Sequence, residues 1–104
     1  MIYSKTLRRG TTPTFDIETF GVDANKFDNV FITFEQGDVE VTKTNEDIDR
    51  LNGIFRVRLT QEETLRFAVG TAKVQLRGMI GGSAVASTIG RVNVKDVLKE
   101  GVIK

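Results

Sequence analysis

Residues 70–78, with the sequence GTAKVQLRG, decide the fold class of this chain, because apolar and polar side chains alternate along them. A period of two is typical of a strand with one face buried and the other exposed to water. We expect the polar residues Lys73, Gln75 and Arg77 to face outward, and the alternate residues to face inward: Ala72, Val74, Leu76 and Ile80. Gly78 interrupts this pattern, and we interpret it as a bulge.

The same alternation predicts further strands on both sides of this segment. Two of them would complete the centre of the core, one burying Phe55, Val57 and Leu59 and the other Val30, Ile32 and Phe34. Additional strands are expected at residues 14–20, 38–44 and 83–94, and a segment at residues 2–7 brings the count to about seven. The gaps between them carry hairpin turn sequences: Gln36-Gly37-Asp38, Asn52-Gly53 and Gly81-Gly82.

One segment breaks the alternation and predicts a short helix. Thr60-Gln61-Glu62-Glu63 fits a capping box, and Gly70 limits the helix to about seven residues. Because so short a helix is not stable alone, Leu65 and Phe67 must anchor it to the sheets. Together these elements predict an all-β chain: an immunoglobulin-like antiparallel β-sandwich of about seven strands with one short helical turn, formed as a single domain over residues 1–104. A small closed barrel stays open as an alternative, because a strand count does not separate the two.

The amino-acid composition excludes several classes of function. The 104 residues contain no Cys and no His, which excludes disulfides, thiol catalysis and the commonest general base and metal ligand. The net charge of +1 argues against nucleic-acid binding, and no apolar run is long enough to cross a bilayer, so we expect synthesis in a cytoplasm.

Catalytic residue patterns are also lacking. No serine lies in a G-x-S-x-G elbow. Two pairs of acids could serve as an acid/base pair, but the helix cap accounts for Glu62 and Glu63, and the outward positions of a strand account for Asp16 and Glu18. The acidic loop at residues 45–49 lacks the spacing and closing Glu of an EF-hand. We therefore expect a protein that is not an enzyme and that uses no cofactor and no metal.

The charges are distributed unevenly along the chain. Residues 1–15 carry +3, residues 16–49 carry −8 and residues 50–104 carry +6. One interpretation is that acidic and basic strands pair across a sheet. The other is that the folded domain has opposite poles and stacks head to tail on copies of itself or on partners.

Two regions are predicted as contact surfaces. The amino-terminal segment carries apolar and basic side chains that could pair with a neighbour's strand edge: Ile2, Tyr3, Leu7, Arg8 and Arg9. The second region is the acidic loop with Glu46, Asp47 and Asp49.

The order of the motifs resembles a group of phage proteins. The resemblance rests on RGTTPT at residues 9–14, FITFEQG at residues 31–37, NGIF at residues 52–55 and LTQEETLRF at residues 59–67, followed by residues 70–78. Nearly the whole chain is similar to the immunoglobulin-like domain of tail and baseplate proteins of phages and prophages of Gram-positive bacteria, such as the amino-terminal domain of baseplate upper proteins.

This resemblance implies a non-enzymatic structural and assembly module. Its partners would be copies of itself or other phage tail proteins, with neither nucleic acid nor membrane among them. It would be made in the cytoplasm of the bacterial host and be present in the virion tail if assembled. The alternative is a small carbohydrate- or ligand-binding β-sandwich module, although the chain has no Trp and a single Tyr to stack on a sugar ring.

Overall fold

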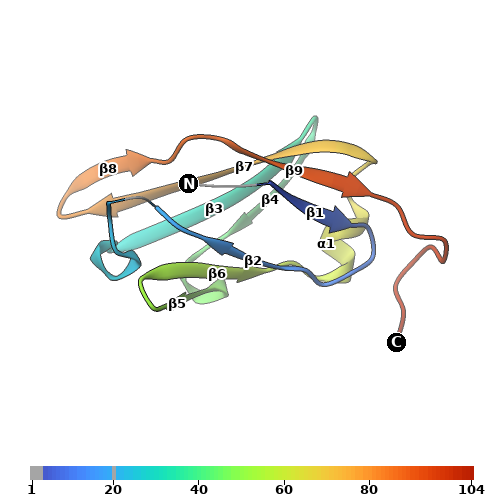
Figure 1. The fold of residues 1–104 in the computed structure, drawn as a ribbon, viewed down its shortest axis with the longest axis horizontal. Coiled ribbons are helices and arrows are strands. Elements are labelled where there is room, and N and C mark those ends of the chain that lie inside the picture. The colour runs from blue at the N-terminus through green and yellow to red at the C-terminus, as the bar shows by residue number, and fades with distance from the viewer. Residues whose placement is uncertain (1–3, 20) are drawn as a thin grey trace.

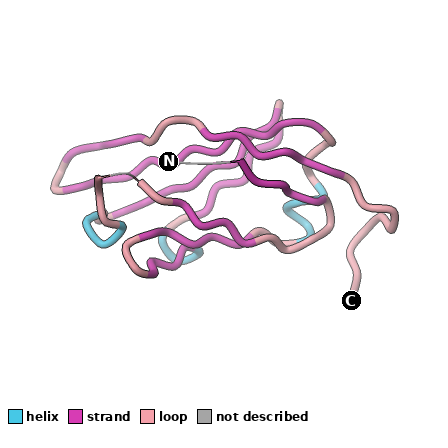
Figure 2. Tube along the Cα trace, in the orientation of Figure 1, coloured by secondary structure: helices cyan, strands magenta, loops and turns pink. Residues whose placement is uncertain are grey.

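The computed structural model describes residues 4–19 and 21–104 of the chain. In these residues the elements are, in chain order, β1 (Ser4–Arg8), β2 (Thr14–Ile17), η1 (Ala24–Lys26), β3 (Asn29–Gln36), β4 (Val39–Lys43), η2 (Asn45–Asp47), β5 (Ile48–Leu51), β6 (Ile54–Arg58), α1 (Gln61–Leu65), β7 (Gly70–Ile80), β8 (Ser83–Ala86) and β9 (Gly90–Lys95). Figure 2 shows that the helical turns are short and lie at the connections between strands.

The strands form two sheets stacked as an all-β sandwich of immunoglobulin-like type (Figure 1). The larger sheet has the order β1-β9-β7-β3-β4, with β8 paired to the far end of the long strand β7. The smaller sheet has the order β2-β6-β5. Neighbouring strands are antiparallel, except that β1 runs parallel to β9. Two separate sheets exclude the barrel alternative for the described residues.

The hairpin turns lie where the turn sequences predict them. Asn52 and Gly53 join β5 to β6 with φ of 51° and 80°, and Gly81 and Gly82 join β7 to β8 with φ of 52° and 87°. Both turns have two residues with positive φ, which matches the right-handed twist of the flanking strands. These turns fix the register of each hairpin, and in the β5–β6 hairpin Ile48, Phe55 and Val57 face the core.

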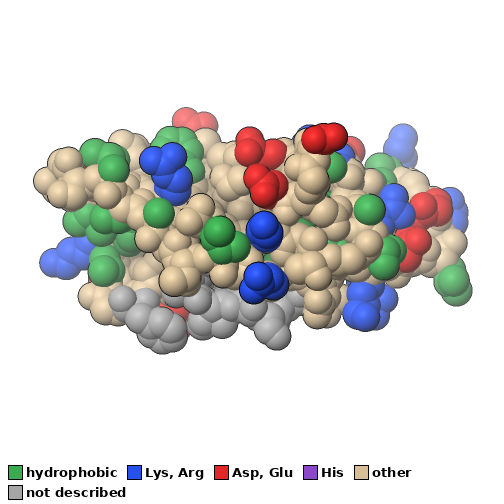
Figure 3. Space-filling view, turned by 90° about the horizontal axis from the view of Figure 1, so that it is seen from above, with side chains coloured by type: hydrophobic (Ala, Val, Ile, Leu, Met, Phe, Trp, Pro, Cys, Tyr) green, Lys and Arg blue, Asp and Glu red, His purple; other side chains and the backbone are tan. Residues whose placement is uncertain are grey.

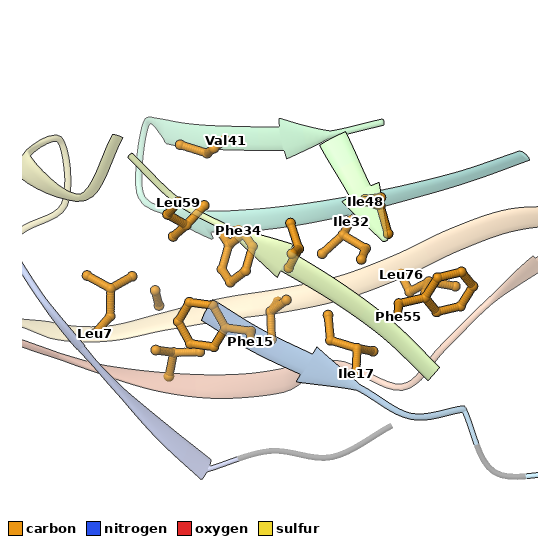
Figure 4. Close-up of a cluster of buried hydrophobic side chains, with 14 of the residues drawn as sticks. Leu7, Phe15, Ile17, Ile32, Phe34, Val41, Ile48, Phe55, Leu59 and Leu76 are labelled. Carbon is orange, nitrogen blue, oxygen red and sulfur yellow. The ribbon is translucent and has the colours of Figure 1, made fainter. Parts of the chain in front are cut away.

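Inward-facing side chains of the two sheets form one apolar cluster (Figure 4). Phe15 of the smaller sheet packs against Phe34 of the larger sheet with ring centroids 5.2 Å apart, and Phe27 meets Phe55 edge-on at the same separation. The three predicted central strands are confirmed, because their inward residues are buried: Val30, Ile32, Phe34, Phe55, Val57, Leu59, Ala72, Val74 and Leu76.

The capping-box helix is confirmed and is shorter than predicted. Thr60 Oγ1 accepts from Glu63 N at 3.2 Å, and Thr60 N donates to Glu63 Oε1 at 2.8 Å. Phe67 is buried as expected, and Thr64 is a second buried anchor that the sequence does not single out. None of the helices in the described residues has the length and apolar character needed to span a membrane.

Three sequence predictions are corrected by the structure. Gly78 is no bulge, because it pairs in register with Val30 and Val85, and its missing side chain makes room for the Phe27 ring. The segment 83–94 forms two strands, β8 and β9, rather than one. The acidic loop ends earlier than predicted, because Ile48 is buried and begins β5.

Candidate interaction surface

The amino-terminal residues predicted as contacts are largely held by the chain itself. Ile2 and Tyr3 lie outside the described residues. Leu7 is fully buried between the sheets, so the prediction that it contacts a partner is wrong, and core packing explains its apolar side chain (Figure 4). Arg8 is exposed at the end of β1, whose residues 4–8 pair along β9 of the same chain rather than along a neighbour's edge.

Arg9 ties the first loop to two other parts of the chain. Its Nε donates to Phe67 O at 2.7 Å, and its Nη1 donates to Asp96 Oδ1 at 2.9 Å and to Glu100 Oε1 at 3.0 Å. Hydrogen bonds to Glu100 and then to Asp96 raise the pKa of Arg9 above its usual value. The side chain of Arg9 therefore forms hydrogen bonds within the chain and is not part of an extended arm.

The three acidic residues predicted as a contact loop lie in two different elements. Glu46 and Asp47 belong to η2, where Asp47 Oδ2 accepts from Thr44 N at 3.3 Å. Asp49 lies on β5 opposite Arg56. All three acids are exposed, so their role in contacts stays a prediction. Within residues 4–19 and 21–104, no three acidic side chains come together as a group able to hold a metal ion.

In the smaller sheet, acidic and basic segments pair across strands. Arg56 of β6 lies between Asp16 of β2 and Asp49 of β5, and Arg56 Nε is 2.7 Å from Asp16 Oδ1. The hydrogen bond that Arg56 donates to the Asp16 carboxylate raises the pKa of Arg56. Opposite charges that lie directly across a strand pair stabilise a sheet. The smaller sheet therefore fits the interpretation in which acidic and basic strands pair with one another.

The larger sheet is different, because one row of side chains on its outer face separates the charges. Glu35 of β3 lies opposite Glu40 of β4 on one side and Lys73 of β7 on the other, and Lys73 lies opposite Arg91 of β9. The row across four strands thus reads Glu40, Glu35, Lys73, Arg91. Figure 3 looks down on this sheet and shows, in the middle of the view, acidic side chains near the upper long edge and basic side chains below them. Like charges placed directly opposite each other destabilise a sheet, so the Glu35–Glu40 and Lys73–Arg91 pairs are unfavourable.

An exposed aromatic side chain lies on the same face. Phe31 is 45% exposed, and it borders a groove of about 380 Å³ lined by Phe31, Thr33, Thr42, Arg77, Gly78, Met79 and Ala84. Such a volume is near the lower end of the range for small-molecule pockets. Exposed apolar area beside separated charges is the composition expected of a contact surface, with an apolar centre and a polar rim. We call this surface, defined by the charged row and the groove, the outer face.

Sequence reasoning missed the outer face as a site. The position of Phe31 was available as a signal, because alternation that buries Val30, Ile32 and Phe34 must point Phe31 to water. The charged row was not available, because it depends on the register of β3 with β7 and of β7 with β9, which are not consecutive in the chain.

Comparisons with protein-family models and with curated proteins find no match. Among solved structures, the chain is similar to part of the endo-β-1,4-mannanase from Thermotoga petrophila, with a TM-score of 0.61 and 19% sequence identity. The match covers 89% of this chain and 18% of the mannanase chain. At this identity the likeness shows a shared fold and no more.

Proposed function

We propose that this chain is a non-enzymatic assembly module that makes protein–protein contacts through the outer face of its larger sheet. The observation that carries the proposal is the juxtaposition of exposed Phe31 with the row in which acids and bases are separated. The order of the sequence motifs supports a phage or prophage tail as the setting, because it resembles the immunoglobulin-like domains of tail and baseplate proteins.

A face of this kind suits recognition of another protein. Neighbouring strands hold their side chains about 4.8 Å apart, so charges on a sheet present a fixed pattern to a partner. Complementary charge patterns speed encounter and fix the orientation of docking, while the apolar centre supplies desolvation energy. The buried cluster beneath the sheet keeps this pattern rigid.

A second candidate function is the binding of a glycan or another small ligand. The observation in its favour is the groove bordered by Phe31, where an aromatic ring lies beside the polar groups of Thr33, Thr42 and Arg77. Clear hits on a glycan array that disappear in Phe31→Ala would favour this candidate over protein assembly.

In-cell photo-crosslinking tests the assembly function. A benzophenone amino acid placed at Thr33 on the outer face should crosslink to a protein that mass spectrometry identifies. The matched control carries the same group at Arg58, which is exposed on the smaller sheet. Crosslinks to a defined protein from position 33 and few from position 58 support the proposal. Equal yields from both positions, or no protein crosslink from position 33, contradict it.

A further inference from the structure

The partner that the outer face fits is a second copy of this chain. Resting on the proposed function, we infer that two copies pack their outer faces together about a two-fold axis parallel to the strands, placed between β3 and β7. The inference follows from the charged row, whose sign pattern is acid, acid, base, base across β4, β3, β7 and β9.

The two-fold axis converts this row into a set of opposite-charge contacts. A rotation of 180° about an axis along the strands reverses the order of the strands from one edge of the sheet to the other. The acidic half of the row in one copy therefore lies over the basic half of the row in the other copy. Glu35 then faces the partner's Lys73, and Glu40 faces the partner's Arg91, with the reciprocal contacts formed at the same time. An isologous interface requires this kind of self-complementarity, in which each contact occurs twice.

Neighbouring rows obey the same relation. Phe31 is in register with Arg77, and Thr33 with Gln75. Across the axis, Phe31 faces the partner's Arg77, where a guanidinium can stack on an aromatic ring. Thr33 faces the partner's Gln75, which can form a hydrogen bond with its hydroxyl. The groove beside Phe31 provides room for these side chains at the centre of the interface.

The charge pattern also selects the orientation. An axis lying in the face but perpendicular to the strands would leave each side of the row facing itself, so acids would meet acids and bases would meet bases. The axis along the strands instead relieves the repulsion between Glu35 and Glu40 and between Lys73 and Arg91 within each copy. Sheets that pack face to face keep their strands roughly aligned, which is compatible with this axis.

Analytical ultracentrifugation of the full chain tests the inference. The wild type should form dimers at low salt and dissociate as salt rises from about 0.01 M to about 1 M, over which the screening length falls from about 30 Å to about 3 Å. The double variant Glu35→Lys, Glu40→Lys makes the row entirely basic, and Lys73→Glu, Arg91→Glu makes it entirely acidic. Each alone should lose more than about tenfold in dimer affinity, because like charges then meet across the axis.

Mixing and inversion separate this result from misfolding. The two double variants mixed together should form a heterodimer, since a basic row then faces an acidic one. The quadruple variant with all four charges inverted should dimerise as the wild type does. A wild type that stays monomeric at low salt, or double variants that do not associate when mixed although each has a native circular dichroism spectrum, would overturn the inference. In that event, crosslinks from position 33 to a different protein would still uphold the proposed function.

Discussion

Lys43 of β4 and Glu63 of α1 form an ion pair that links the edge of the larger sheet to the helix that connects the two sheets, with 2.8 Å between Lys43 Nζ and Glu63 Oε1. The Lys43 side chain is only 10% exposed. Its charge therefore depends on Glu63 for compensation, because a buried ammonium without a partner is costly. The same carboxylate completes the helix cap with Thr60 N.

Glu63→Gln should lower the free energy of unfolding by about 1–3 kcal/mol, because it weakens the cap and leaves Lys43 without a counter-charge. Urea denaturation followed by circular dichroism measures the loss. The matched control is Glu62→Gln, an exposed neighbour in the same helical turn, where we expect a few tenths of a kcal/mol from the helix dipole. Equal losses in the two variants would contradict the role given to the Lys43 pair.

The stability contributed by Glu63 should depend on pH. Burial, the largest single influence, raises the pKa of Glu63, but hydrogen bonds from Lys43 and Thr60 together outweigh it and hold that pKa below its usual value. A carboxylate with a lowered folded pKa stabilises the protein above the unfolded value of about 4.3, and this stabilisation is lost as the pH falls through the folded pKa. The stability difference between wild type and Glu63→Gln should be largest near neutral pH and shrink below about pH 4. A difference that stays constant on acidification would show that the charge of Glu63 is not its source.

Thr64 should be sensitive to loss of its hydroxyl group. Its Oγ1 donates to Thr11 O at 2.9 Å and accepts from Gly10 N at 3.0 Å, and the residue is fully buried. Thr64→Val keeps the shape but removes a bond partner from two backbone groups, so we expect a loss of about 1–3 kcal/mol. Thr88→Val, at an exposed position, serves as the control in thermal unfolding. A near-zero effect at Thr64 would contradict the stabilising role given to these two hydrogen bonds.

Gly78→Ala should destabilise the sandwich through a steric clash. An added Cβ would lie 2.7 Å from Asn29 O and 2.7 Å from a ring carbon of Phe27. The chain must shift to relieve these contacts, at a cost of about 1–3 kcal/mol. Thr71→Ala, exposed on the same strand, should have a much smaller effect. A similar melting temperature for both variants would contradict the close packing at Gly78.

Much of the fold can be predicted from the sequence because its signals are local. Alternation over residues 70–80, the Asn52-Gly53 turn and the capping box at Thr60 each specify a conformation within a few residues. Strand β5 escaped prediction because its four residues, with Asp49 and Arg50 at the centre, are too short and polar to show an alternating pattern. The packing role of Gly78 depends on Phe27, which is distant in the sequence.

The candidate surface was harder to predict for the same reason. The sequence alone predicts apolar Leu7 as a contact residue. Its burial depends on the pairing of β1 with β9, a strand more than 80 residues later in the chain. The charge asymmetry along the chain was visible in the sequence. Which of these charges become neighbours on a sheet is decided by non-local register, and only the folded chain aligns Glu35 with Lys73.

The central claim is that this chain binds a second copy of itself through the outer face of the larger sheet. A dilution series followed by amide chemical shifts in two-dimensional NMR tests it most directly, since a chain of 11.6 kDa is well suited to the method. We predict that shifts change with concentration at the residues of the outer face on β3 and β7, such as Phe31, Thr33, Gln75 and Arg77. Concentration-dependent shifts confined to the smaller sheet β2-β6-β5, or no change at any concentration, would contradict the claim that this face binds a second copy.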